Sequence, residues 1–298
     1  GTMLNYYKRD LVTVGIDPIL SNFKKFYKNI NFSVNDFFSF NTLKNNKLDN
    51  EYKIISALSV FYDLKKPNNF LKDIKKLLHP SGVFILEHAD LLSIVKNNLF
   101  DTICHEHLEY YSTKIIIDIM YKNNLKVFNI KKNNINGGSI RYYISHKDAK
   151  FKINKKKILP IINEENKYKL EKINTYKNFL KKINIQKNKL NLFLKKELIK
   201  KKIFHGYGAS TKGNVLLQYF KIDNNQIDFV ADRNPKKYNL YTPGTKIKII
   251  SEKLSRRIKP DYYLVLPWHF KSEILKRERK IRNKKTRFIF PLPKFQVI

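Results

Sequence analysis

Cysteine, tryptophan and glycine are scarce in this 298-residue chain, which contains one, one and nine of them. A single cysteine excludes an internal disulfide framework and fits a reducing compartment. No apolar run reaches the length of a membrane span, and the first residues lack the architecture of a signal peptide. We therefore expect a cytoplasmic protein with no membrane partner.

Acidic residues are also few, because 25 Asp and Glu stand against 60 Lys and Arg, for a formal charge of +35. This excess would suit a non-enzymatic nucleic-acid-binding protein, whose binding would depend steeply on salt. Most of the excess is lysine, however, and it accompanies asparagine and isoleucine throughout, as mutational drift toward A and T would produce. We expect no nucleic-acid partner, although the charge would still steer an anionic substrate.

Hydrophobic residues make up 42% of the chain and aromatic residues 13%, which supports packed globular structure. The length suits two domains of ordinary size. Alternating strand and helix patterns predict an α/β domain over residues 1–150 and a second, smaller α/β domain over 203–298. Between them, residues 151–202 show the apolar spacing of amphipathic helices and are predicted to form a helical linker.

The most unusual stretch is Asp101–Ser112, which reads D-T-I-C-H-E-H-L-E-Y-Y-S. Histidine beside a carboxylate is suited to proton transfer near neutral pH. On an extended segment His105 and His107 would share a face, with Glu106 opposite. Two other interpretations stay open. One is a metal-dependent enzyme that uses His105 and His107 with a third ligand such as Cys104, although the usual zinc spacing is missing, and the other is a hydrogen-bonded polar turn.

The first domain is predicted to carry polar residues where its strands end, which is where ligands gather in open α/β sheets. Asp17 follows a strand over Leu11–Ile16, and Glu87 sits at the carboxyl end of a strand over Val83–Leu86. The other elements predicted in this domain are helices over Ser21–Tyr27, Asn69–Leu78 and Lys114–Asn124, a turn at His79–Gly82, and strands over Phe32–Phe37, Lys53–Leu58, Lys126–Ile130 and Ser139–Ser145.

Three motifs in fixed order carry a resemblance to a known family: the stretch Asp101–Ser112, N-G-G-S-I-R at Asn136–Arg141, and G-Y-G-A-S-T-K-G at Gly206–Gly213. Together they resemble the S-adenosylmethionine-dependent sugar C-methyltransferases, over Met3 to Ile298. The resemblance implies a class I methyltransferase-type doubly wound sheet and a second Rossmann-like α/β domain. It also implies S-adenosylmethionine as cofactor, a nucleotide-linked keto-deoxysugar as substrate, and a monomer. We assign no residue to a metal.

The resemblance also implies which residues hold the cofactor. Asp17 would accept the ribose hydroxyls, and Asp36 would contact the adenine amino group with Phe37 stacked nearby. The full set assigned to the cofactor is Gly1, Asp17, Pro18, Asp36, Phe37 and Glu87.

A glycine-rich loop and its strand normally precede such an acidic residue by about 20 positions or more, and only sixteen residues stand before Asp17. Gly1 would be the tail of that loop. We therefore expect an N-terminally truncated fragment that lacks the first strand and the zinc module common in the family. Such a fragment would have exposed strand edges, fold poorly and be inactive by itself.

For catalysis the resemblance implies His107 as the base that removes a proton next to a ketone. Glu106 or Glu109 would orient an imidazole, and His105 or Tyr110 would stabilise the enolate oxygen. The chain departs from the family in two places. Cys104 stands where tyrosine is frequent, and no histidine occurs between Ser56 and Leu64.

Substrate contacts are predicted in two turns. The N-G-G turn would let a sugar or phosphate approach the backbone, although its glycines could simply turn the chain. The glycine turn after Tyr207 opens a helix whose backbone amides suit an anion. Trp268 could equally be core or substrate platform. The residues assigned to the substrate are Asn136, Gly137, Gly138, Ser139, Gly208, Lys212 and Asp232.

Overall fold

The structure, a computed structural model, describes residues 2–8, 10–27, 29–279 and 286–298, so the predicted cofactor residue Gly1 lies outside the described residues. The chain divides into two compact units. One comprises residues 1–87, 114–131 and 141–158, and the other comprises residues 88–113, 132–140 and 159–298. No helix in the described ranges is long and apolar enough to cross a membrane.

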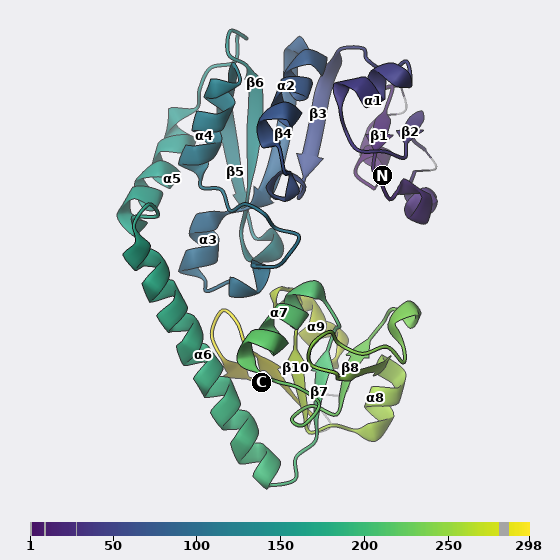
Figure 1. The fold of residues 1–298 in the computed structure, drawn as a ribbon, viewed down its shortest axis with the longest axis vertical. Coiled ribbons are helices and arrows are strands. Elements are labelled where there is room, and N and C mark those ends of the chain that lie inside the picture. The colour runs from purple at the N-terminus through teal and green to yellow at the C-terminus, as the bar shows by residue number, and fades with distance from the viewer. Residues whose placement is uncertain (1, 9, 28, 280–285) are drawn as a thin grey trace. The chain divides into compact units, whose positions relative to one another are not determined.

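The first unit is an α/β structure with two sheets (Figure 1). The larger sheet has the order β3-β4-β6-β5, and the parallel pair β1 and β2 forms a separate sheet. Among the residues described, no strand joins the two. The bounds of the elements are β1 Val14–Ile16, β2 Phe32–Val34, α1 Phe40–Asn45, β3 Tyr52–Leu58, α2 Pro67–Leu77, β4 Leu78–Ala89, α4 Thr113–Lys122, β5 Leu125–Asn133 and β6 Ser139–His146, with short 3-10 turns at Leu4–Tyr6 and Leu20–Phe26.

Helix α2 shows how local sequence sets these elements. Pro67 occupies the first turn, where its missing N–H costs nothing. Leu71, Ile74 and Leu77 follow at spacings of three and are buried, so the helix has one apolar face to pack on the sheet. The prediction of a helix here is confirmed. Over Ser21–Tyr27 the predicted helix is instead the short 3-10 element.

The turn predicted at His79–Gly82 is wrong in one respect, because these residues lie inside the bounds of β4. Tyr52 of β3 pairs with Leu78, whereas Ile54 pairs with Val83. The four intervening residues therefore leave the ladder as a bulge, and the strand resumes after it.

The second unit is built on a six-stranded sheet of order β12-β11-β10-β7-β8-β9, parallel except at β12. Figure 1 shows β7 between β10 and β8. The elements of this unit are α3 Leu91–Lys96, the 3-10 turn η4 Phe100–Thr102, α5 Lys155–Tyr168, α6 Ile173–Ile199, β7 Phe204–Tyr207, α7 Thr211–Phe220, β8 Phe229–Asp232, β9 Lys248–Ser251, α8 Glu252–Ile258, β10 Tyr262–Val265, the 3-10 turn η7 Trp268–Phe270, α9 Lys271–Arg277, β11 Arg287–Phe290 and β12 Gln296–Val297.

One hydrophobic core in this unit includes Leu99 and Phe100, just before the histidine-containing stretch Asp101–Ser112, as well as the C-terminal sheet. Phe100 stacks on Phe220 of α7, with 5.1 Å between ring centroids. Contacts thus group residues 88–113 and 132–140 with the C-terminal sheet. The domain limits proposed from the sequence at 150 and 202 stay a prediction.

The prediction of an α/β doubly wound fold with a second α/β domain is confirmed. The predicted strands over Lys53–Leu58, Lys126–Ile130 and Ser139–Ser145 correspond to β3, β5 and β6. The short connection between β5 and β6 allows only antiparallel pairing of these two neighbouring strands.

Candidate functional site

Within the histidine-containing stretch Asp101–Ser112, residues 104–107 form a turn, so this part is not the extended segment on which His105 and His107 would share a face. The N–H of His107 donates to the carbonyl of Cys104 at 3.2 Å. His105 and Glu106 at the tip of the turn are exposed, while His107 is half-buried. The polar-turn interpretation therefore describes the backbone correctly, and His107 is the histidine held by its surroundings.

His107 lies in an environment that keeps its imidazole neutral. Burial lowers the pKa of His107, and the positive charge of Lys212 acts in the same direction. The hydroxyl of Thr102 lies 3.4 Å from Nδ1. A neutral imidazole near pH 7 can accept a proton, as a general base requires.

The other predicted catalytic side chains have different surroundings. Glu106 accepts a hydrogen bond from its own backbone N–H, which lowers the pKa of this carboxyl, and the Cys104 thiol acts in the same direction. The Tyr110 hydroxyl lies 3.3 Å from the carbonyl of His107, a long contact, and its ring meets the His107 ring edge-on at 6.4 Å. Tyr110 thus packs against the turn. The exposed His105 has no such hydrogen bond or ring contact within the described residues.

Asp101, just before the turn, is completely buried. Its Oδ2 accepts a 2.7 Å hydrogen bond from Nε1 of Trp268, and its Oδ1 has no hydrogen-bond partner among the residues that the structure describes. Burial raises the pKa of Asp101 to about 6, although Lys212 and Trp268 oppose the shift. Trp268 is 6% exposed and belongs to the core. Its role is therefore to anchor the carboxylate.

Lys212 connects three of the motifs. It lies in the first turn of α7, where the Ser210 hydroxyl caps the helix by accepting the N–H of Gly213. The ammonium donates to the carbonyl of Asn136 at 3.4 Å. Burial lowers the pKa of Lys212, while Asp101 and, more weakly, Cys104 raise it.

The two glycines of the N-G-G turn are required by packing. A Cβ on Gly137 would lie 2.8 Å from Leu99 and 3.0 Å from the Trp268 ring, and one on Gly138 would lie 2.6 Å from Ser93. Both also have positive φ, +92° and +143°, where side chains are strained. Their missing side chains thus let this turn lie against α3 and Trp268.

Ser139, Gly208 and Asp232 have local structural partners. The Ser139 hydroxyl donates to the carbonyl of Ile135 at 2.9 Å. Asp232 accepts the N–H of Ala209 at 2.7 Å, so the carboxylate holds the glycine turn. A Cβ on Gly208 would meet Pro267 at 2.8 Å.

Four of the predicted cofactor residues lie in the first unit after β1 and β2, namely Asp17, Pro18, Asp36 and Phe37. Asp17 is half-buried and accepts the N–H of Ile19 at 2.9 Å and the hydroxyl of Tyr27 at 3.3 Å. Each carboxylate oxygen has a second lone pair, so it can still accept ribose hydroxyls. Pro18 and Asp36 are exposed, and the ring of Phe37 is 74% exposed and available to stack. The assignment of these residues to the adenosine part of the cofactor stays a prediction.

Glu87 lies inside β4 rather than at its end, and it is 5% exposed. Its carboxylate forms a 2.7 Å ion pair with Arg141 of β6. Because this pairing compensates a buried charge, it explains an acidic residue in the strand without a ligand.

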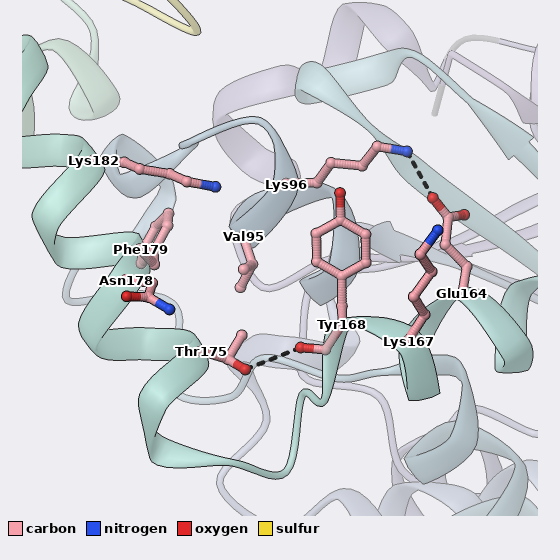
Figure 2. A pocket seen from close by; sticks show the side chains of 9 residues that line it. All are labelled: Val95, Lys96, Glu164, Lys167, Tyr168, Thr175, Asn178, Phe179 and Lys182. Atoms are coloured by element: carbon pink, nitrogen blue, oxygen red, sulfur yellow. Dashed lines mark hydrogen bonds and ion pairs between the residues drawn. The ribbon is translucent and has the colours of Figure 1, made fainter.

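The second unit also contains a pocket of about 440 Å³ beside α3, α5 and α6. Figure 2 shows Lys96 paired with Glu164, at 2.6 Å, and Thr175 bonded to the carbonyl of Tyr168, at 2.9 Å. None of its lining residues belongs to the sites predicted from the sequence.

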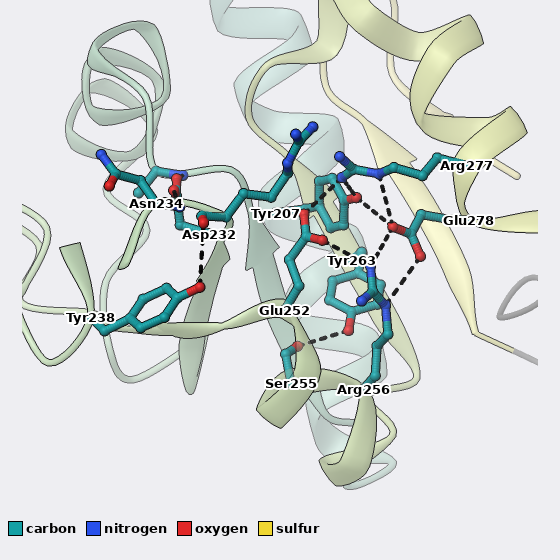
Figure 3. A network of polar contacts seen from close by, with 12 residues as sticks. Tyr207, Asp232, Asn234, Tyr238, Glu252, Ser255, Arg256, Tyr263, Arg277 and Glu278 are labelled. Atoms are coloured by element: carbon teal, nitrogen blue, oxygen red, sulfur yellow. Dashed lines mark hydrogen bonds and ion pairs between the residues drawn. The ribbon is translucent and has the colours of Figure 1, made fainter. Parts of the chain in front are cut away.

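A network of charged side chains, centred on the buried Glu278, stabilises the C-terminal sheet (Figure 3). Glu278 is 2% exposed and pairs with Arg256 at 2.6 Å and Arg277 at 3.2 Å, and it accepts the Tyr207 hydroxyl at 2.7 Å. Glu252 pairs with both arginines. Every charge thus has an opposite partner, which is typical of a structural network. Within the described ranges no group of three or more His, Cys, Asp or Glu is placed to hold a metal ion.

Comparison with known proteins supports the methyltransferase class. The family described as "C-methyltransferase C-terminal domain" matches residues 134–293, and the one described as "Methyltransferase domain" matches residues 1–130. The C-methyltransferase NovU of Streptomyces niveus is 28% identical over 246 residues, which are 83% of this chain and 58% of that protein. The chain thus spans less than two thirds of the length of this relative.

Solved structures of similar proteins include a methyltransferase from Thermotoga maritima, described as a possible histamine N-methyltransferase, with 14% identity and a TM-score of 0.35 over 46% of this chain and 73% of that one. Another is an S-adenosylmethionine-dependent methyltransferase from Clostridium acetobutylicum, with 12% identity and a TM-score of 0.34 over 46% and 75% of the two chains.

The two matching families together describe a methyltransferase domain followed by a C-methyltransferase C-terminal domain. More particularly, the chain belongs to the C-methyltransferase family, whose C-terminal domain covers more than half of its length. The resemblance noted in the sequence is confirmed, and S-adenosylmethionine is the cofactor of this family.

Two residues of the site escaped the analysis of the sequence. Asp101 opens a quoted motif and His269 directly follows Trp268, but neither had an assigned role. Nδ1 of His269 is buried and has no hydrogen-bond partner within the described ranges, and burial, helped by the charge of Lys212, lowers the pKa of His269 to about 4. The pairing of an acidic residue with an aromatic one would have indicated this part of the site, but Asp101 and Trp268 stand 167 positions apart in the sequence.

Proposed function

We propose that the protein is a C-methyltransferase that transfers a methyl group from S-adenosylmethionine to a carbon next to the ketone of a nucleotide-linked keto-deoxysugar. The observation that carries the proposal is that residues of the three motifs and Trp268 lie in one unit. The positive charge of Lys212 lowers the pKa of the half-buried His107 and opposes the rise in the pKa of Asp101. The Lys212 ammonium donates to the carbonyl of Asn136, and Asp101 accepts a hydrogen bond from Trp268. The relative NovU is a C-methyltransferase, which agrees with carbon as the acceptor.

Methylation of carbon requires a carbanion equivalent, and a proton next to a ketone is the accessible one. In the proposed reaction the neutral imidazole of His107 removes this proton, and the electron pair moves to the ketone oxygen as an enolate. When bound, S-adenosylmethionine supplies an electrophilic methyl group for that carbon. The exposed ring of Phe37 and the carboxylate of Asp17 would hold its adenosine part.

The polar and basic side chains around His107 suit a substrate that carries negative charge. A keto-sugar offers a carbonyl oxygen that becomes negative in the reaction, and its nucleotide carries a negative diphosphate. The protein has 60 basic residues to attract such an anion. We assign the substrate to the surface that Asn136 and Lys212 share, and we propose that the enzyme acts as a monomer in the cytoplasm without a nucleic-acid partner.

The test is methyl transfer from ¹³C-methyl-labelled S-adenosylmethionine to a panel of nucleotide-linked keto-deoxysugars, followed by NMR. The full-length protein should place the label on a ring carbon next to the ketone. A nucleotide sugar without a ketone is the matched control and should stay unlabelled. Labelling of an oxygen or nitrogen, or of the control sugar, would contradict the proposal.

A further inference from the structure

Removal of a proton next to a ketone needs two groups, a base for the proton and a cation or hydrogen-bond donor for the oxygen. Stabilisation of the developing oxyanion is usually the larger contribution. The sequence offered His105 and Tyr110 for the second role. His105 is exposed at the tip of the turn, and the Tyr110 hydroxyl faces backbone carbonyls.

Lys212 is better placed for this role than either side chain. It is half-buried, and its charge acts on His107. An ammonium group has three N–H bonds, and the contact with Asn136 uses one of them. Because that contact is long, at 3.4 Å, it would orient the ammonium group and leave its positive charge available to stabilise an oxyanion.

Asp101 supplies the counter-charge. Its side chain is fixed because Oδ2 accepts a hydrogen bond from the buried Trp268 at 2.7 Å, while Oδ1 is buried and has no hydrogen-bond partner in the described part of the chain. An unpaired oxygen of a buried carboxylate is costly unless a nearby cation compensates it. Lys212 is a cation that acts on this carboxylate.

We propose that Lys212 is the catalytic residue that stabilises the enolate oxygen, and that Asp101 is the positioning residue that holds the Lys212 ammonium in place and charged. The inference rests on the proposed function, since it assigns the oxyanion of that reaction. Lys212 thus takes the role that the sequence offered to His105 or Tyr110, and His107 stays the base.

The pH dependence follows from the titratable groups around Lys212. Asp101 and Cys104 raise the pKa of Lys212, and the charge of Lys212 in turn lowers the pKa of His107 and of His269. Asp101 is the largest influence that favours the ammonium form, because its negative charge raises the pKa of Lys212 against the effect of burial. Without that charge, Lys212 would lose its proton at lower pH. The basic limb of the pH–rate profile should then move to lower pH.

The experiment compares Lys212→Gln, Lys212→Arg and Asp101→Asn in the full-length protein. Solvent deuterium exchange next to the ketone and methyl transfer are both measured. Lys212→Gln should lose about 10²–10³-fold in the exchange rate, as expected for one oxyanion donor, and Lys212→Arg should recover part of it. Lys221→Gln, at the exposed end of the same helix, is the matched control and should behave as wild type.

Asp101→Asn keeps an oxygen acceptor for Trp268 and gives a second readout if Lys212→Gln folds poorly. Its basic limb should move to lower pH, which loss of packing alone would not cause. If wild type neither exchanges nor transfers methyl, the proposed function fails and this inference with it. If wild type does both, and Lys212→Gln equals wild type or the limb of Asp101→Asn does not move, this inference alone is overturned.

Discussion

The indole N–H of Trp268 donates to the carboxylate of Asp101 at 2.7 Å, across 167 positions of sequence. The pair ties the histidine-containing stretch to the C-terminal domain, and both partners are buried. A buried hydrogen bond to a carboxylate is worth more than a neutral one, and leaving the carboxylate unbonded is costly.

Trp268→Phe should therefore lower the free energy of unfolding by about 1–3 kcal/mol or more, because it leaves a buried carboxylate without its donor. Urea unfolding followed by far-UV circular dichroism measures this, since the chain has no other tryptophan to report by fluorescence. In an Asp101→Leu background no carboxylate remains to be stranded, so the same substitution should cost less. Equal costs in both backgrounds would show that the hydrogen bond contributes nothing.

Arg141→Gln should also destabilise the protein, because it leaves the charge of Glu87 buried without a partner. We expect a loss of about 2–3 kcal/mol, below the usual cost for a fully buried pair because a third of the Arg141 side chain is exposed. Lys202→Gln is the matched control. Its ion pair with Asp261 is exposed to 41% and 33%, and its loss should cost about 0–1 kcal/mol. Similar losses for both variants would refute the assignment.

The stability of the protein should fall as the pH falls below about 6.5, partly through His205. This side chain is fully buried, and burial lowers the pKa of His205 to about 4. Between the unfolded value of about 6.5 and the folded value, only the unfolded chain binds the proton, so unfolding is favoured as the pH decreases. The contribution is about 2 kcal/mol between pH 7 and pH 5.

Urea unfolding at these two pH values tests this. His205→Phe should be less stable than wild type at pH 7 but should lose less stability on acidification. The exposed His105 is the control position, and His105→Gln should keep the slope of wild type. A wild-type slope in His205→Phe would assign the acid sensitivity to other groups.

Elements with a strong local signal could be predicted from the sequence. The proline start and apolar spacing of α2 specify that helix within the segment itself. The bulge in β4 could not be predicted, because it depends on how Tyr52 and Ile54 pair with residues about 30 positions away. The turn predicted at His79–Gly82 lies at this bulge, and its place within a continuing strand was missed.

The site divides in the same way. The residue types of the histidine-containing stretch pointed to acid/base chemistry, and the roles of His107 and Lys212 stay predictions. The sequence could not show that Asp101 supports Lys212, because burial, the hydrogen bond to Trp268 and the unpaired oxygen exist only in the folded chain. Likewise, the packing demand on Gly137 and Gly138 comes from α3 and Trp268.

The central claim is that the His107 imidazole takes a proton from carbon. The most direct measurement is solvent deuterium exchange at the carbon next to the ketone, in the full-length protein with a nucleotide-linked keto-deoxysugar. Wild type and His105→Ala should both exchange, whereas His107→Ala should show no exchange above the uncatalysed rate. Exchange at the wild-type rate in His107→Ala would contradict the account.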